Sequence, residues 1–194
     1  MQEHFGSGFA VALTAIFWRE SWKYGERAYR YCSLDTGHAL AALAFAARLH
    51  NWRCIAVSGA GDDQLATLLG MDRTAWWPLE REAPELFCWV STGPGDRLVS
   101  QKLPDSLASS FSKVAFSGRP NRLSAQAMDW VLIEQAADAT CKSSASPQPL
   151  KLPKGSLRRR QPVDQTAAAV IRRRRSAAKF DPKGYIAKEL FGPF

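Results

Sequence analysis

Short apolar runs alternate with longer mixed segments along the first half of the chain. Three of these runs are rich in β-branched or aromatic residues and are bounded by glycine or polar positions, a pattern that predicts buried strands. They span residues 9–18, 53–58 and 86–90. Residues 37–50 lie between the first two runs and are mostly Ala, Leu and Phe, which predicts a helix buried on most of its circumference.

Polar and glycine positions indicate where these elements begin and end. Asp35 or Thr36 can cap the apolar helix, because a side-chain oxygen accepts a bond from a free N–H of the first turn. Residues 19–34 are polar and aromatic without a clear period, so we expect an extended segment that turns into this helix. Asp62 is expected to cap a short helix that Gly70 ends. The order of strands and helices predicts an α/β or α+β domain.

The second half of the chain is less regular. Residues 96–123 are expected to form loops and one weak helix, and Ser124 can cap a further helix over residues 125–140. Side chains three to four positions apart lie on the same face of a helix. One face of this helix would therefore carry Trp130, Ile133 and Ala137.

The C-terminal part of the chain differs in composition. Residues 142–163 are rich in Pro, Ser and basic residues and predict a flexible linker, residues 164–174 predict a last helix, and residues 180–184 predict a turn. Residues 151–194 carry 12 Lys/Arg and 3 Asp/Glu, a net charge of +9, whereas residues 1–150 carry 14 and 15, a net charge of −1. Binding of nucleic acid or of an anionic surface would therefore be a property of the tail alone, and we do not expect nucleic acid as a partner.

The cysteines and the apolar N-terminal run bear on the compartment. No C-x-x-C pair and no His at zinc-ligand spacing accompanies the cysteines, so we expect no metal site and small buried thiols in a reducing compartment. The four cysteines are Cys32, Cys54, Cys88 and Cys141. Residues 8–18 are too short to span a membrane, and no Lys or Arg precedes them as in a signal peptide. These features predict a soluble, cytoplasmic protein.

Two groups of titratable residues lie near the apolar helix. Lys23 and Tyr24 can act as general base or acid if burial lowers the pKa of the lysine, but an exposed surface pair is the simpler interpretation. His38 could transfer protons, although a His at such a position more often bonds a neighbouring backbone group. Residue type alone favours the simpler interpretation for both groups.

Two further groups could bind a ligand. Ser58 and Gly59 follow a buried strand, where glycine lets a flat or charged ligand approach the backbone, and a plain strand-to-helix turn explains them as well. Arg174, Arg175 and Ser176 suit a phosphate, because guanidinium groups match its oxygens, and a solvated basic run explains them about as well. The dinucleotide-binding, P-loop and nucleophile-elbow motifs are absent from the sequence.

Four segments taken together resemble one family. They are WKYGERAYRY followed by LDTGHALAALAFAARL, AVSGAGDDQLATLLGMD, FSGRPNRLSAQAMDW, and IRRRRSAAKFDPKG. The set resembles the nitroreductase superfamily of FMN-dependent enzymes, and within it the SagB-type dehydrogenases. The resemblance covers most of the chain. It implies an α+β fold of the nitroreductase type, an α/β sandwich with a central buried helix.

The order of these segments differs from that of a complete nitroreductase domain, in which the Arg-Arg-Ser signature comes first. The resemblance identifies residues 1–95 as the C-terminal half of one module and residues 164–194 as the start of a second. Residues 96–141 are then a helical connecting segment and residues 142–163 the flexible linker. We expect the fold to be incomplete, and the chain to be a fragment or a shortened tandem protein.

The resemblance assigns roles near the start of the central helix and after the second strand. Lys23 and Tyr24 match a pair that handles the proton when SagB-type enzymes oxidise azoline rings in peptides, with FMN taking the hydride. Ser58 and Gly59 match the turn whose backbone faces the flavin ring.

The Arg-Arg-Ser signature would hold the flavin phosphate and contact the ring. It corresponds to Arg174, Arg175 and Ser176. Where the family usually has a further basic residue, this chain has Ala178, with Lys179 one position later. A phosphate site without that cation would bind FMN more weakly.

We therefore expect an FMN-dependent oxidoreductase of the SagB-type dehydrogenase class, which acts on a small-molecule or peptide substrate as a homodimer. The alternative is a degenerate, flavin-free piece that serves as a binding or scaffold partner in a peptide-modifying complex. Lys23 and Tyr24 favour the first hypothesis. Ala178 and the missing half-module favour the second.

Overall fold

The computed structural model divides the chain into two compact units, Met1–Pro147 and Gln148–Phe194, which we describe separately. The structure describes residues 1–93, 102–118, 120–126, 128–143 and 164–185. The first unit combines helices with a small antiparallel sheet, so the α+β class is confirmed.

The sheet has three strands in the order β1-β3-β2, and both pairings are antiparallel. β1 spans Gly8–Ala15, β2 spans Arg53–Ala56 and β3 spans Ala83–Ser91. The three predicted strands are therefore confirmed, with shifted ends. The first strand stops earlier than predicted because Phe17 already begins a helix, in which its ring is buried.

The segment before the apolar helix is helical and not extended, which corrects the expectation for residues 19–34. α2 spans Phe17–Tyr24, a 3₁₀ turn spans Gly25–Arg27, and α3 spans Ala28–Leu49. Phe17 and Ser21 lie one turn apart on α2 and are both buried, so this short helix has a core-facing side.

α3 starts well before the predicted capping residues, for a reason that lies outside the helix. Ala28 and Cys32 are one turn apart and pack against Phe17 and Ile133. These contacts extend the helix past Asp35, which lies exposed within it.

The expectation that α3 is buried on most of its circumference is wrong for this structure. Its buried residues are only Ala28, Cys32 and Ala47. Phe45 is 72% exposed and Leu49 is 57% exposed. A three-stranded sheet offers one narrow face to a helix of 22 residues, and the rest of the helix surface stays uncovered.

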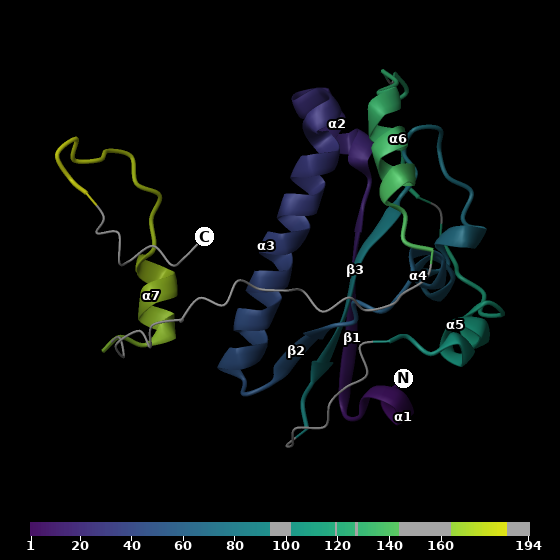
Figure 1. Cartoon of the computed structure of the whole chain (residues 1–194), viewed down its shortest axis with the longest axis horizontal. Helices are drawn as coiled ribbons and strands as arrows, with labels where there is room; N and C mark the ends of the chain where they lie inside the picture. The colour runs from purple at the N-terminus through teal and green to yellow at the C-terminus, as the bar shows by residue number, and fades with distance from the viewer. Residues whose placement is uncertain (94–101, 119, 127, 144–163, 186–194) are drawn as a thin grey trace. The chain divides into compact units, whose positions relative to one another are not determined.

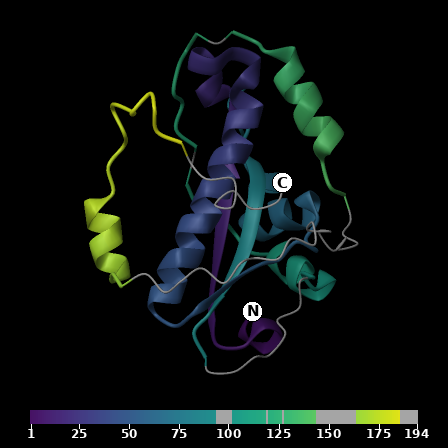
Figure 2. The same cartoon turned by 60° about the vertical axis from the view of Figure 1, so that its left-hand side comes forward.

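The main core lies on the opposite side of the sheet from α3, as Figures 1 and 2 show. There β3 contributes Phe87 and Trp89, which alternate with residues that face α3. Three helices cover this side, and they are α1 (Gln2–Phe5), α4 (Asp62–Leu69) and α5 (Asp105–Phe111). α5 is the weak helix expected within residues 96–123.

The residues that begin and end α4 lie within one position of those predicted from the sequence. Gly61, and not Asp62, is the N-cap, and its N–H donates to the Gln64 side chain at 3.1 Å. Gly70 ends the helix in the left-handed conformation, as predicted, and a 3₁₀ turn over Met71–Arg73 follows.

α6 spans Val131–Thr140 and begins later than predicted. Ser124 does not cap it, because its hydroxyl donates to Gln126 O and accepts from Gln126 N–H within a local turn. The predicted inner face is confirmed. Trp130, Ile133 and Ala137 all pack in the cluster around Phe17 and Ala28.

In the second unit, the described residues form one helix and one turn. α7 spans Ala167–Arg173, slightly shorter than predicted, and the Thr166 hydroxyl caps it by accepting from Ala169 N–H at 3.2 Å. The turn predicted at residues 180–184 is confirmed, with Gly184 N–H donating to Asp181 O at 3.0 Å. Most of the predicted linker, residues 144–163, lies outside the described residues.

Candidate functional site

Lys23 and Tyr24 lie at the end of α2, on the surface. The Lys23 ammonium is 5.0 Å from the centre of the Tyr24 ring, and the centres of the Tyr24 and Tyr31 rings are 4.3 Å apart with the two planes tilted by 35°. The hydrogen bond and charge of Tyr24 raise the pKa of Lys23 above its ordinary value. The amine is therefore protonated at neutral pH, and the burial that would make it a general base is not found.

His38 has the simpler role that residue type favoured. Its Nδ1 lies 2.9 Å from Leu34 O, one turn earlier on α3, and 3.8 Å from an Asp35 carboxylate oxygen. All of these groups are exposed on the helix surface.

Ser58 and Gly59 belong to the turn between β2 and α4, and the chain's own residues Lys142 and Ser143 lie against this turn. Lys142 Nζ donates to Ser58 O at 2.9 Å. Asp62 and Lys142 exchange two more bonds, from Asp62 N–H to Lys142 O at 2.7 Å and from Lys142 N–H to Asp62 Oδ2 at 2.8 Å.

Residues 142–143, which we call the cover of this turn, pack closely against Gly61. A Cβ at Gly61 would stand 3.0 Å from Ser143 O and 3.1 Å from Lys142 O, closer than ordinary contacts allow. Gly61 permits the close approach of a backbone, which is that of residues 142–143, whereas the sequence prediction concerned a ligand at Gly59.

Arg174, Arg175 and Ser176 follow α7 in the second unit and are exposed. Arg175 Nη1 donates to the carbonyl oxygens of Arg172 at 2.9 Å and Arg174 at 2.8 Å, so it closes the end of its own helix. In the first unit, the described contacts of Lys23 are with Tyr24 and those of Ser58 are with Lys142. Within the first unit, Lys23 and Tyr24 thus form one local group, and Ser58 and Gly59 belong to another.

A polar hollow of about 240 Å³ lies beside the covered turn and was not predicted from the sequence. It is lined by Phe17, Tyr29, Asp62, Ala83, Pro84, Glu85, Ala137, Thr140 and Lys142. Tyr29 and Thr140 join their hydroxyl groups at 2.6 Å across it. Burial raises the pKa of Glu85, the nearby Asp62 charge adds to the rise, and a bond from Thr36 opposes it.

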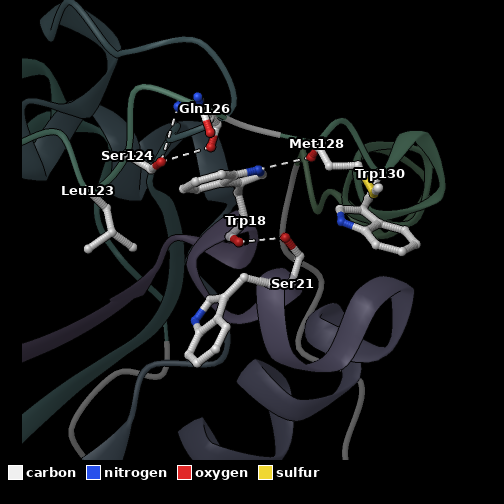
Figure 3. A pocket seen from close by; sticks show the side chains of 8 residues that line it. Trp18, Ser21, Leu123, Ser124, Gln126, Met128 and Trp130 are labelled. Atoms are coloured by element: carbon white, nitrogen blue, oxygen red, sulfur yellow. Dashed lines mark hydrogen bonds between the residues drawn. The ribbon is translucent and has the colours of Figure 1, made fainter.

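A larger pocket of about 430 Å³ lies between α2 and the segment before α6, and we call it the tryptophan pocket. It is lined by Trp18, Ser21, Trp22, Leu123, Ser124, Gln126, Met128 and Trp130. Figure 3 shows the Trp18 indole lying between Ser124 and Met128, with its N–H donating to Met128 O at 3.1 Å.

An ion pair between the half-buried Arg19 and the buried Glu80 holds the pocket wall to α2. Both Arg19 Nε and Nη2 donate to Glu80 Oε2, at 3.1 and 2.9 Å. Glu80 also accepts from the backbone N–H of Leu123 at 2.9 Å, and its side chain is only 3% exposed. Burial alone would raise the pKa of Glu80, but the bonds from Arg19, Leu123 and Ser124 outweigh it, so the pKa lies below its ordinary value.

Sequence reasoning missed the tryptophan pocket because it did not predict α2. Trp18 and Trp22 stand four positions apart, which is a single face of a helix once the helix is known. The signal was present in the seven tryptophans of a 194-residue chain. The partners of Trp18 and Arg19 are distant in sequence, so their spacing gives no signal.

The described residues bear on the predictions about the cysteines, a metal site and a membrane span. All four thiols are free, with Cys32 and Cys88 buried, Cys54 half-buried and Cys141 exposed, so the expectation of burial is wrong for Cys141. Among the described residues, no cluster of three or more His, Cys, Asp or Glu could hold a metal ion, and no helix is both long and apolar enough to cross a membrane. Comparison with protein-family models, curated proteins and solved structures gives no match to this chain.

Proposed function

We propose that this chain is a nitroreductase-like module that acts as a binding partner in a peptide-modifying complex and binds no flavin in the form described here. The observation that supports the flavin-free part of the proposal is that residues 142–143 lie against the turn after β2. Lys142 bonds Ser58 O, and the backbone of residues 142–143 fills the space at Gly61. A flavin ring would need that same backbone surface.

The remaining residues do not fit FMN either. Lys23 is exposed and its pKa is raised, so it offers no base to a reaction at a flavin. Arg175 uses one guanidinium nitrogen on the carbonyl groups of its own helix end.

The second candidate is an FMN-dependent oxidoreductase of the SagB-type dehydrogenase class with a small-molecule or peptide substrate. Exposed side chains favour it. Lys23, Arg174 and Ser176 are all open to solvent, so their surroundings leave them accessible to a ligand. This candidate requires residues 142–143 to leave the turn.

A flavin titration separates the two candidates. Purified full-length chain is titrated with FMN, and binding is followed by flavin fluorescence quenching and by absorbance after desalting. The binding-partner proposal expects no quenching at saturating FMN. Quenching that is lost in Arg174→Ala/Arg175→Ala and kept in Lys113→Ala, an exposed control, would establish the oxidoreductase candidate in its place.

We also propose that the protein forms a homodimer and is located in the cytoplasm. The nitroreductase resemblance implies a homodimer, and the uncovered apolar residues of α3 support this. Phe45 and Leu49 are both more than half exposed. Four free thiols accord with a reducing compartment.

A further inference from the structure

We propose that the tryptophan pocket binds a small, uncharged, planar aromatic ring that carries a hydrogen-bond acceptor. The pocket's volume of about 430 Å³ falls within the range of ordinary small-molecule sites. Its lining combines three indole rings with a few neutral polar groups, which is the composition of such sites. The inference is independent of the presence or absence of flavin.

The shape of the pocket is fixed before any ligand enters. Trp18 is held by its bond to Met128 O, and the wall that carries Leu123 is held by Glu80. Trp130 lies against the backbone of Gly25, where a Cβ would stand 3.2 Å from the indole. A ligand therefore loses little affinity to ordering these groups.

The rim of the pocket is unusually apolar for an open surface. Trp22 is 76% exposed, Met128 is 65% exposed and Leu123 is 54% exposed. Clustered apolar side chains around a concavity are typical of a surface that a ligand covers. Trp22, as the most exposed of the three, offers its indole face to a ring bound in the pocket.

The absence of charge in the lining selects an uncharged ligand. None of the eight lining residues is ionisable, so a charged group would lose its hydration without gaining a partner. Indole faces also attract cations. A cation would gain that attraction, but no carboxylate lines the pocket to replace the hydration that it loses.

Several N–H donors in the pocket lining have no acceptor in the described part of the protein, and this favours a ligand ring that carries a hydrogen-bond acceptor. The indole N–H groups of Trp22 and Trp130 and the side-chain amide of Gln126 make no hydrogen bond with any described residue. Of the three indoles that line the pocket, Trp18 has its N–H bonded to another described residue, Met128. A heteroaromatic nitrogen or a carbonyl on the ligand would pair with one of these free donors while the ring stacks on indole.

The test uses quinoxaline, an uncharged planar ring with two acceptor nitrogens, and the full-length chain. Saturation-transfer NMR detects binding, and calorimetry gives the affinity. Trp22→Ala should weaken binding roughly threefold to tenfold, because the variant loses one of the indole faces on which an aromatic ring can stack. Trp22→Phe should retain most of the affinity. Phe45→Ala, which removes an equally exposed aromatic group from α3, should change nothing.

Two comparison probes sharpen the test. Cyclohexanol matches the size of one ring but is neither flat nor aromatic, and tetramethylammonium is a cation of similar bulk. Both should bind much more weakly than quinoxaline. The proposal is overturned if the unmodified chain does not bind quinoxaline, if Trp22→Ala binds it equally well, or if either comparison probe binds as tightly. Circular dichroism of Trp22→Ala confirms that the variant is folded.

Discussion

Arg19 and Glu80 stand 61 positions apart in the sequence and form a bifurcated pair, in which two guanidinium nitrogens donate to one carboxylate oxygen. Arg19 also donates to Asn121 O at 3.0 Å, and Glu80 accepts from Leu123 N–H. One charge pair thus connects α2, the approach to β3 and the loop that walls the tryptophan pocket.

Removing the charge of Glu80 should destabilise the first unit. Glu80→Gln keeps the size of the side chain but weakens every bond that Glu80 accepts and leaves Arg19 without its counter-ion. We expect a loss of about 1–3 kcal/mol in the free energy of unfolding, because hydrogen bonds to a charged group contribute about that much and the Glu80 side chain is buried. Urea denaturation measures it. Glu134→Gln on the exposed surface of α6 should stay within about 0.5 kcal/mol of the unmodified chain.

The same carboxylate should make stability fall in acid. The folded pKa of Glu80 is lower than its ordinary value of 4.5, so its contribution is complete above that pH. It is lost as the pH falls through the folded pKa. Below about pH 4.5 the unmodified chain should therefore lose its advantage over Glu80→Gln. An advantage that stays constant down to pH 3 would contradict this assignment.

Glu85 should behave in the opposite sense. Burial raises its pKa, so the folded state binds the proton more tightly than the unfolded state does. This contributes stability that is full below the unfolded pKa and is lost as the pH rises through the folded pKa. Glu85→Gln is neutral at every pH and should raise the melting temperature at pH 7, with the gain disappearing near pH 4. Thermal melts at both pH values test it, and equal melting temperatures at pH 7 would refute it.

Two glycine substitutions should change stability in opposite directions. Gly70 has φ 74° and its Cβ would stand 2.5 Å from the Phe116 ring, so Gly70→Ala should lose about 1–3 kcal/mol. Gly37 lies inside α3 with open space around it, so Gly37→Ala should gain about 0.5–1 kcal/mol from helix propensity. Chemical denaturation compares both with the unmodified chain. A loss at Gly37 would mean that its face of α3 is packed in solution.

A charge on the apolar face of α3 should disrupt self-association. If two copies meet there, Phe45→Glu places a carboxylate in a desolvated contact and should convert a dimer to a monomer in light scattering. Val114→Glu introduces the same charge at an exposed apolar position on another segment and should leave the mass unchanged. A dimer that survives Phe45→Glu would exclude α3 as the contact.

The sequence predicted the elements whose signals are local. The strands around Cys54 and Cys88 have dense apolar composition, and Gly70 marks the end of α4 by its own backbone preference. The start of α3 was missed because it depends on tertiary contacts of Ala28 and Cys32. Polar residues such as Asp35, which favour a cap, lie within that helix instead.

The candidate sites were less predictable than the fold. Lys23 and Tyr24 are adjacent in sequence and in space, so their pairing was evident, but the exposure of Lys23 depends on how α2 sits on the unit. The cover on Ser58 depends on Lys142, 84 positions away. No spacing rule along a single sequence reports such an encounter.

The strand order determines when the sheet can form during synthesis on the ribosome. β3 lies between β1 and β2, so every inter-strand hydrogen bond of the described sheet involves a strand that is synthesised last. At about 5–20 residues per second, β1 waits several seconds for its only partner. During that interval the backbone groups of β1 form hydrogen bonds with water. A chaperone that binds nascent chains can therefore reach this strand most easily before Ser91 has been synthesised.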